Sequence, residues 1–213
     1  KIKVPPPNCC PESRLIRRCM WRNEHSLFRR LNSASKAKKT LISIYHPDEK
    51  IITYDKETWW GDSWDPCNYG REYDFSRPFF EQFRELLERV PQMPLFDSKS
   101  INSRFCNVAV EQKNCYLVSA AWRSEDCMYC NRLWHGMFTH DSYTSFATEF
   151  CYENVYCSDS SRLFFSRESE GCLDSFFLYD CRNCSNCILC TNLWHKNYCI
   201  ENTQYSKEEY EEK

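Results

Sequence analysis

The chain has 213 residues, a formal net charge of −2, 42% hydrophobic and 27% charged residues, so it can bury a core and is not a disordered chain. Its four glycines are widely separated, which excludes the glycine-rich loops of P-loop and dinucleotide-binding proteins. No apolar run reaches the roughly 18 residues that a membrane-spanning helix requires. The sequence starts at Lys1 without a secretory signal, which favours a cytoplasmic protein; removal of a leader would leave an extracellular location open.

Charge is distributed unevenly along the chain. Residues 1–39 contain 11 Lys and Arg against 2 acidic residues, whereas residues 61–213 contain 15 basic and 24 acidic residues. A basic head on an acidic body favours an anionic partner for the head. The alternatives are a solvated basic helix face, or arginines that pair with the acidic part of the same chain.

Residues 1–73 form the first predicted zone, a basic head. Residues 14–22 alternate arginines with apolar residues and predict a short basic helix. Residues 41–45 and 51–54 are rich in β-branched and aromatic residues, and the short turn segment between them predicts a β-hairpin. Arginine beside aromatic side chains suits phosphate contacts and base stacking. The head therefore predicts an anion-binding or nucleic-acid-binding site at Arg14, Arg17, Arg18, Arg22, Arg29 and Arg30.

Residues 74–99 form the second zone, an amphipathic helix and a linker. Ser76 is the expected N-cap, and Pro78 falls in the first turn. Apolar residues recur at helical spacing from Phe79 to Val90, and Pro91 ends the helix. We expect a helix that packs on the core, with a groove-binding helix as the alternative.

Residues 100–205 form the third zone, a Cys/Asn-rich repeat. Twelve of the 16 cysteines lie between Cys106 and Cys199. A polar residue followed by Asn or Asp (once by Gly), and usually by Cys within three positions, recurs at uneven short intervals, starting at Lys113, Glu125, His140, Glu153, Glu170, Arg182 and Lys196. These intervals are too short for helical repeats, which need about 33 residues or more. They suit the coils of a β-solenoid.

The residue types support such a solenoid. Asn and Asp tolerate the left-handed backbone of a repeated corner. Neutral Cys is small and usually buried, so stacked coils can direct a ladder of thiols toward the axis. Residues 206–213 begin with the capping box Ser206–Glu209 and predict a helix that caps the end. The fold class is therefore mainly β: a short Cys-rich β-solenoid (β-helix) behind a small α+β head and a linking helix.

Cysteine pairs separated by two residues also suggest a metal site, because two thiolates at that spacing can face one zinc ion. The strongest candidates are Cys181, Cys184, Cys187 and Cys190, with Cys127 and Cys130 as a second half-site. Only two residues separate the two halves of the first set, so a ligand from a neighbouring coil, such as Cys172 or Cys199, would help to complete it. The favoured alternative is a ladder of neutral thiols without metal, and the third is disulfide bonding.

A Leu-Trp-His tripeptide occurs twice in the repeat, at residues 133–135 and 193–195. This recurrence fits one position on two coils, and exposed aromatic rows are typical of binding surfaces. We therefore expect a recognition face at Trp134, His135, Trp194 and His195. No catalytic residue is predicted.

Seven segments carry a family resemblance: residues 4–7, 10–15, 21–24, 59–60, 64–66, 69–83 and 205–210. They resemble an uncharacterised group of environmental bacterial proteins that pair an N-terminal zinc-ribbon-like segment with a Cys/Asn-rich repeat region. The resemblance brings no known activity. Ser13 stands where the second thiol of a Cys-Pro-x-Cys knuckle would be, and residues 32–39 contain no Cys, so the expected head is a degenerate zinc ribbon.

These observations favour a non-enzymatic recognition or scaffold module that can hold structural zinc. A protein partner or self-association is the expected mode of action. Two alternatives stay open: a nucleic-acid-binding protein that uses the basic head, and an extracellular, disulfide-stapled surface or filament protein.

Overall fold

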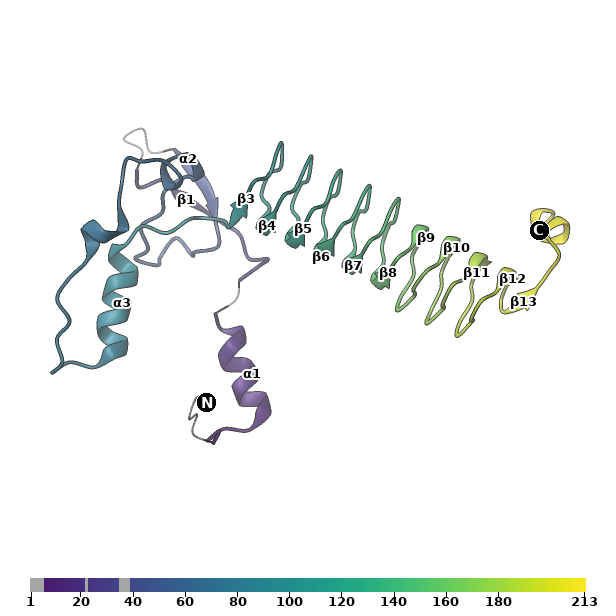
Figure 1. Ribbon diagram of the computed structural model, residues 1–213, viewed down its shortest axis with the longest axis horizontal. Helices are drawn as coiled ribbons and strands as arrows, with labels where there is room; N and C mark the ends of the chain where they lie inside the picture. Colours follow the sequence, from purple (N-terminus) through teal and green to yellow (C-terminus); the bar gives the residue numbers. More distant parts are fainter. Residues whose placement is uncertain (1–5, 22, 35–38) are drawn as a thin grey trace.

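Figure 1 shows the computed structural model of the chain, which describes residues 6–21, 23–34 and 39–213. A small head leads into a long rod of stacked coils, and a short helix lies at the far end of the rod. The rod is a β-solenoid of about nine turns, which confirms the expected mainly β fold class.

The described residues of the head form three short helices, one 3-10 helix and a two-stranded sheet. Its elements are α1 (Pro11–Cys19), β1 (Phe28–Leu31), β2 (Thr40–Ser43), α2 (Lys56–Trp59), η1 (Pro66–Tyr69) and α3 (Phe79–Arg89). The expected hairpin between residues 41–45 and 51–54 is wrong, because β2 pairs antiparallel with β1 and Thr53 forms a parallel bridge with Gln92. Arg30 of β1 explains the difference, since its guanidinium donates hydrogen bonds to the carbonyls of His46 and Ile51 and so closes the loop after β2.

Helix α3 is held to the head mainly by polar contacts. Pro78 is its N-cap and has no side-chain cap, so the expected cap at Ser76 is wrong. Buried Gln82 bonds the backbone N–H and C=O of Asp74 at 2.9 Å each, and Arg71 pairs with Glu85. The expected packing of the apolar face is only partial: Leu86, Leu87 and Val90 are half-buried, whereas the aromatic side chains are exposed, with Phe80 at 77%.

The solenoid strands are short, and neighbouring strands in each sheet lie parallel up to β12. The first sheet comprises β3 (Asp97–Ser98), β4 (Asn107–Val110), β5 (Ser119–Trp122), β6 (Asn131–Trp134), β7 (Tyr143–Phe146) and β8 (Val155–Ser158). The second comprises β9 (Ser161–Phe164), β10 (Leu173–Phe176), β11 (Ser185–Ile188), β12 (Asn197–Ile200) and β13 (Thr203–Gln204). Each residue pairs with the residue 12 positions later, as Asn107 does with Ser119 and Ser185 does with Asn197. All coils therefore have this one length, in contrast to the variable spacing that the sequence phrases suggested.

Each coil consists of four triplets of residues, and the chain bends at one corner in each triplet. Every third residue from Lys99 to Glu201 has a φ between 46° and 63°. Asn114 and Asp126 occupy such left-handed positions, as expected, but so do Val108 and Thr144, whose β-branched side chains disfavour them. Asn154 departs from the expected corner role, because its side chain is buried. The fold imposes the left-handed turn on almost any residue type.

Hydrogen bonds between coils stabilise these turns. Arg104 donates its N–H to the carbonyl of Cys115 and accepts the N–H of Leu117 on its own carbonyl. The residue after each turn points inward, and small Cys, Ser, Ala and Thr side chains fill most of these positions. Two clusters of buried residues, rich in cysteine, run along the rod and form its core.

Both ends of the solenoid are covered within the described part of the chain. At the head end, Ala109 donates its N–H to the carbonyl of Phe96. At the other end, β13 pairs antiparallel with β12. Helix α4 (Lys207–Glu211) follows, and it starts with the expected capping box between Ser206 and Glu209.

Candidate functional site: the faces of the solenoid

The interior of the solenoid satisfies the backbone groups that the ladder leaves unpaired. At several inward positions the backbone N–H is accepted by the Ser side chain one coil earlier. Ser166 shows both halves of this arrangement: its Oγ donates to the carbonyl of Phe164 at 2.9 Å and accepts the N–H of Leu178 at 3.0 Å. Ser160 does the same with the carbonyl of Ser158 and the N–H of Cys172. Cys, Ser and Thr suit the inward position because each is both a donor and an acceptor.

The four cysteines of the strongest metal candidate are the four inward positions of one coil. Each sulfur donates to the carbonyl two residues earlier, at distances of 3.2 to 3.5 Å, in Cys181, Cys184, Cys187 and Cys190. Each sulfur also lies 3.4 to 3.8 Å from the carbonyl oxygen nine residues later, a second acceptor for its single S–H. The four thiols thus point toward one axis, which the sequence could not establish.

These thiols do not fit a zinc site as the structure arranges them. Zinc requires thiolates, and a thiol that donates to a carbonyl is protonated. Burial raises the pKa of Cys187 and Cys181, the opposite of what a ligand needs. Among the residues that the structure describes, no group of three or more His, Cys, Asp or Glu side chains could hold a metal ion.

The proposed second half-site has the same character. Cys127 and Cys130 occupy neighbouring sides of one coil, and their sulfurs donate to the carbonyls of Glu125 and Met128. Burial raises the pKa of Cys130 to about 12. All 16 cysteines of the chain are free in this structure, and twelve of them are buried. The structure thus contains the ladder of thiols that the sequence favoured.

The predicted recognition residues lie in two adjacent columns on the outside of the rod. Successive bridges between neighbouring coils link Trp122, Trp134, Phe146, Ser158, Glu170, Arg182 and Trp194 into one column. His135 and His195 occupy the left-handed position that follows it. The expectation that Trp134 and Trp194 hold one position on different coils is confirmed, but they lie five coils apart and do not meet.

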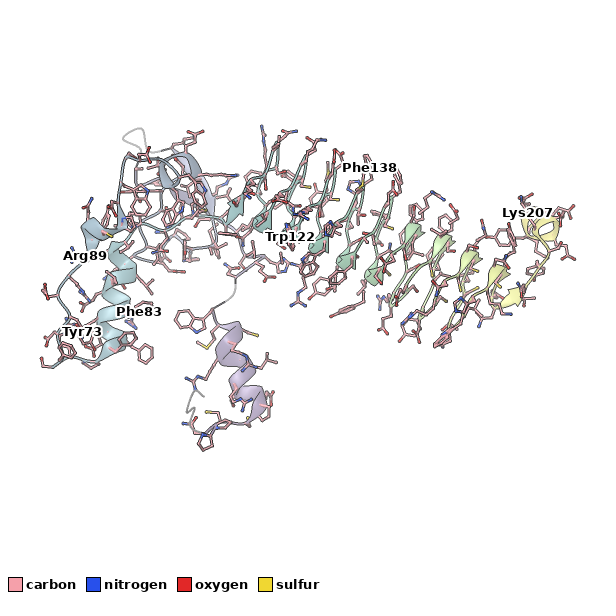
Figure 2. All side chains as sticks on the ribbon, in the orientation of Figure 1. Tyr73, Phe83, Arg89, Trp122, Phe138 and Lys207 are labelled. Atoms are coloured by element: carbon pink, nitrogen blue, oxygen red, sulfur yellow. The ribbon has the colours of Figure 1, made fainter. Side chains whose placement is uncertain are left out.

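A groove lies beside the Trp column over β4–β7. Its volume is about 880 Å³, and small or apolar side chains line most of it: Val108, Val110, Ala120, Ala121, Trp122, Trp134, Thr144 and Phe146. Lys99, Glu111 and Arg132 add charge at its margins. The groove exists because small residues stand next to the large rings of the neighbouring column. In Figure 2, Trp122 lies toward the lower edge of the rod and Phe138 toward its upper edge.

A longer apolar surface, which was not predicted from the sequence, lies elsewhere on the rod, and we name it the aromatic face. It lies on two adjacent columns half a coil away from the Trp column, and its apolar members are Phe105, Tyr116, Leu117, Met128, Tyr129, Tyr152, Phe164, Phe165, Phe176, Phe177, Ile188 and Leu189. Arg104, His140, Asp141 and Glu153 stand in the same columns, so the longest uninterrupted apolar stretch is the one from Phe164 to Leu189. Phe164 stacks on Phe176, and Phe165 stacks on Phe177, with ring centroids 5.0 and 5.1 Å apart. The regular recurrence of two adjacent apolar residues, at 164–165, 176–177 and 188–189, is the signal that could have revealed it.

Charged side chains on the outside also pair between coils. The carboxylate of Glu111 lies 3.8 Å from Nζ of Lys99 in the preceding coil and 2.7 Å from Nε of Arg123 in the next. Arg162 and Asp174 repeat this spacing with a two-pronged contact. These arginines therefore bind carboxylates within the solenoid.

The predicted basic site is only partly assembled. Arg14, Arg17 and Arg18 lie on α1 with Trp21 close by, and these four residues, of which Arg14 is half-buried and the others are exposed, line a shallow pocket of about 320 Å³. Arg29 is exposed on β1, at a separate place in the head. Arg30 instead bonds loop carbonyls, and Arg22 lies outside the described residues.

No family model matches the chain, and no curated protein shows significant similarity to it. Among solved structures, a mutant of perosamine N-acetyltransferase from Caulobacter crescentus, in complex with CoA and GDP-perosamine, aligns with 9% sequence identity and a TM-score of 0.16. The alignment covers 57% of this chain and 59% of that chain. In the described part of the chain, no helix has the length and apolar character needed to cross a membrane.

Proposed function

We propose that this protein is a non-enzymatic recognition module, a rigid rod whose aromatic face binds another protein surface. The observation that carries the proposal is the run of adjacent apolar side chains along the outside of the solenoid, of which Phe177 and Leu189 are 50% and 53% exposed. Exposed apolar surface of this extent is typical of sites that bind proteins.

The geometry of the rings favours a protein over a sugar or a nucleobase. Phe164 and Phe176 are nearly parallel, at 12°, as are Phe165 and Phe177, at 10°. Stacked rings cover each other's faces and leave their edges exposed. Bases stack on ring faces, whereas apolar side chains of a protein can pack against ring edges.

A second copy of this chain is the partner that the periodicity favours. Neighbouring coils are about 4.8 Å apart, and only another solenoid presents side chains at the same interval along its whole length. Two aromatic faces can then interdigitate row by row. Self-association through this face is the specific form of the proposal.

Sedimentation analysis of the full chain over a range of protein concentrations tests this form. We expect a dimer that dissociates on dilution, and a monomer for the double variant Phe165→Ser, Phe177→Ser. The matched control is Phe138→Ser, Phe150→Ser, because these rings are also stacked and exposed but lie on another side of the rod. A wild-type monomer at every concentration, or an equal effect of the control, would overturn the proposal.

Nucleic-acid binding through α1 is a second candidate, favoured by the cluster of Arg14, Arg17, Arg18 and Trp21. Neutralising phosphates releases counterions, so the affinity for DNA or RNA oligonucleotides should fall steeply with salt concentration. Fluorescence anisotropy titrations at several salt concentrations would measure this. The variant in which the three arginines are replaced by alanine should lose the salt dependence, whereas Arg104→Ala should keep it.

Structural zinc and disulfide bonding stay predictions of the sequence rather than parts of the proposed function. Metal analysis of freshly purified protein, together with a count of free thiols after denaturation, tests both. Sixteen free thiols and no bound metal would agree with the hydrogen-bonded thiol ladder; bound zinc would require the inward sulfurs to give up their carbonyl contacts.

A further inference from the structure

Helix α1 buries none of its residues, as is also true of the shorter α2, and it is the longer of the two. Leu15, Ile16 and Met20 are 53%, 55% and 78% exposed. Together with Cys19 they occupy one side of the helix, because Leu15 and Cys19, and Ile16 and Met20, are each four positions apart and form two adjacent rows. Arg14, Arg17, Arg18 and Trp21 occupy the opposite side by the same spacing. Such an amphipathic helix needs an apolar surface to cover its first face.

The segment that follows α1 is fixed at the edge of the groove. Asn107 donates its side-chain amide to the carbonyl of Asn23 at 3.1 Å, and Asn23 donates its own to the carbonyl of Ile44 at 2.7 Å. Asn107 is the first residue of β4, directly before Val108 of the groove. Figure 1 shows α1 below the end of the rod that adjoins the head, near β3 and β4. The helix is thus attached a few residues from the groove.

The dimensions of helix and groove agree. Nine helical residues span about 13.5 Å at 1.5 Å per residue. The four strands β4–β7 span three intervals of about 4.8 Å, or about 14 Å. The groove floor is small and apolar at Ala120 and Ala121, which leaves room for the side chains of a helix, and Trp122 forms part of its wall.

We propose that α1 is a strap that closes lengthwise over the groove of β4–β7 in the same chain. The helix swings about its attachment at Asn23. Leu15, Ile16 and Met20 pack against Val108, Trp122 and Trp134, and the arginine side of the helix faces solvent. The closed strap covers the groove and presents the three arginines beside the rod, while the open strap exposes the groove. This contact lies on the opposite side of the solenoid from the aromatic face and does not depend on the proposed self-association.

Site-specific photo-crosslinking of the full chain tests the strap. With Ile16 replaced by p-benzoylphenylalanine, irradiation followed by mass spectrometry should yield crosslinks within one chain to residues 108–146. The same probe at Arg17, on the other side of the helix, should yield few of them. Crosslinks to α3, crosslinks only between chains, or equal yields from both probes would overturn the proposal.

A matched pair of groove variants completes the test. Trp122→Ser with Trp134→Ser should reduce the crosslink yield from position 16 by about tenfold, since large apolar contacts are lost. Trp194→Ser alters the same column beyond the reach of α1 and should leave the yield unchanged. Circular dichroism confirms that each variant is folded, and an unchanged yield in the folded double variant would also overturn the proposal.

Discussion

At the scale of the residue, the solenoid explains why Cys, Ser and Thr are common at its inward positions, beside aliphatic residues such as Leu133 and Leu163. An aliphatic side chain would fill the same space but could not accept the N–H of the next coil. Buried N–H groups without a partner cost about 1–3 kcal/mol each. The cysteine-rich composition is therefore a solution to backbone hydrogen bonding, and it needs neither metal nor disulfides.

Ser166 provides a direct test of this role. Ser166→Ala leaves the buried N–H of Leu178 without its acceptor, so we expect a loss of about 2 kcal/mol in the free energy of unfolding. Ser166→Cys keeps a donor and an acceptor and should cost less than about 1 kcal/mol. Urea-induced unfolding, followed by circular dichroism, measures both. Equal losses in the two variants would show that size, rather than hydrogen bonding, governs the position.

The buried thiols also make stability depend on pH. Burial raises the pKa of Cys157 to about 11 and that of Cys172 to about 12, above their ordinary value near 9. The folded state thus holds more protons than the unfolded state above pH 9, and the linkage relation makes the free energy of unfolding fall as pH rises there. We expect the contribution of the buried thiols to the free energy of unfolding to be constant below about pH 8.5 and to decrease progressively toward pH 11. Urea midpoints across this range measure it, and a flat profile would contradict it.

Residue types showed that a solenoid was present but concealed its exact period. Asn114 and Asp126 follow the expected corner rule, and Cys115 and Cys127 point inward after them. Ser166 and Thr139 also point inward, but the Asn/Asp-Cys motif that predicted an inward residue does not precede them. Ser and Thr replace Cys at inward positions without changing the backbone. The spacing between successive cysteines is therefore irregular, and it conceals the constant three-residue period of the coil.

At the scale of the element, prediction failed where side chains act on distant backbone. The β1 segment contains Arg29 and Arg30 and resembled a charge run, so its pairing with β2 was missed. The long contacts of Arg30 with the loop at 46–51 give no local sequence signal. Helix α4, by contrast, was predicted correctly, because a capping box is local.

The C-terminal elements shield an open strand edge. Strand β13 pairs with β12, and the ring centroids of Tyr210 in α4 and Tyr198 in β12 are 5.6 Å apart. Removal of residues 203–213 should expose the edge of β12 and produce end-to-end dimers, because unpaired strand edges recruit other strands. The other end of the rod is covered by the head, so growth should stop at two copies.

Light scattering after size-exclusion chromatography measures this prediction. The truncation should be made in the Phe165→Ser, Phe177→Ser background, so that association through the aromatic face does not contribute. Tyr210→Ser, which keeps β13 in place, is the control and should stay monomeric. A monomeric truncated protein would show that β13 does not protect the edge.

At the scale of the whole molecule, the rod is a one-dimensional stack in which each coil contacts only its neighbours. Stability is then close to a sum of coil and interface contributions, and a complete coil can be removed without altering the rest. Deleting residues 161–172 joins Ser160 to Leu173 and keeps every later residue in its column. The side chain of Asn154, which now bonds the backbone of Leu163 and Ser166, would meet the equivalent groups of the coil that moves up.

Register decides the outcome of such a deletion. Removing the whole coil, 161–172, should give a folded rod that is shorter by one coil and has a cooperative unfolding transition. Removing only 161–171 shifts every later side chain by one position, so Leu178 and Cys181 would leave the interior and the outward residues Phe177 and Asp180 would replace them. Because an inward Asp has no counterion there, we expect this variant to lose its C-terminal coils. Limited proteolysis distinguishes the two: the whole-coil deletion should resist cleavage along the entire rod, whereas cleavage of both variants at the same rate would disprove a fixed coil length.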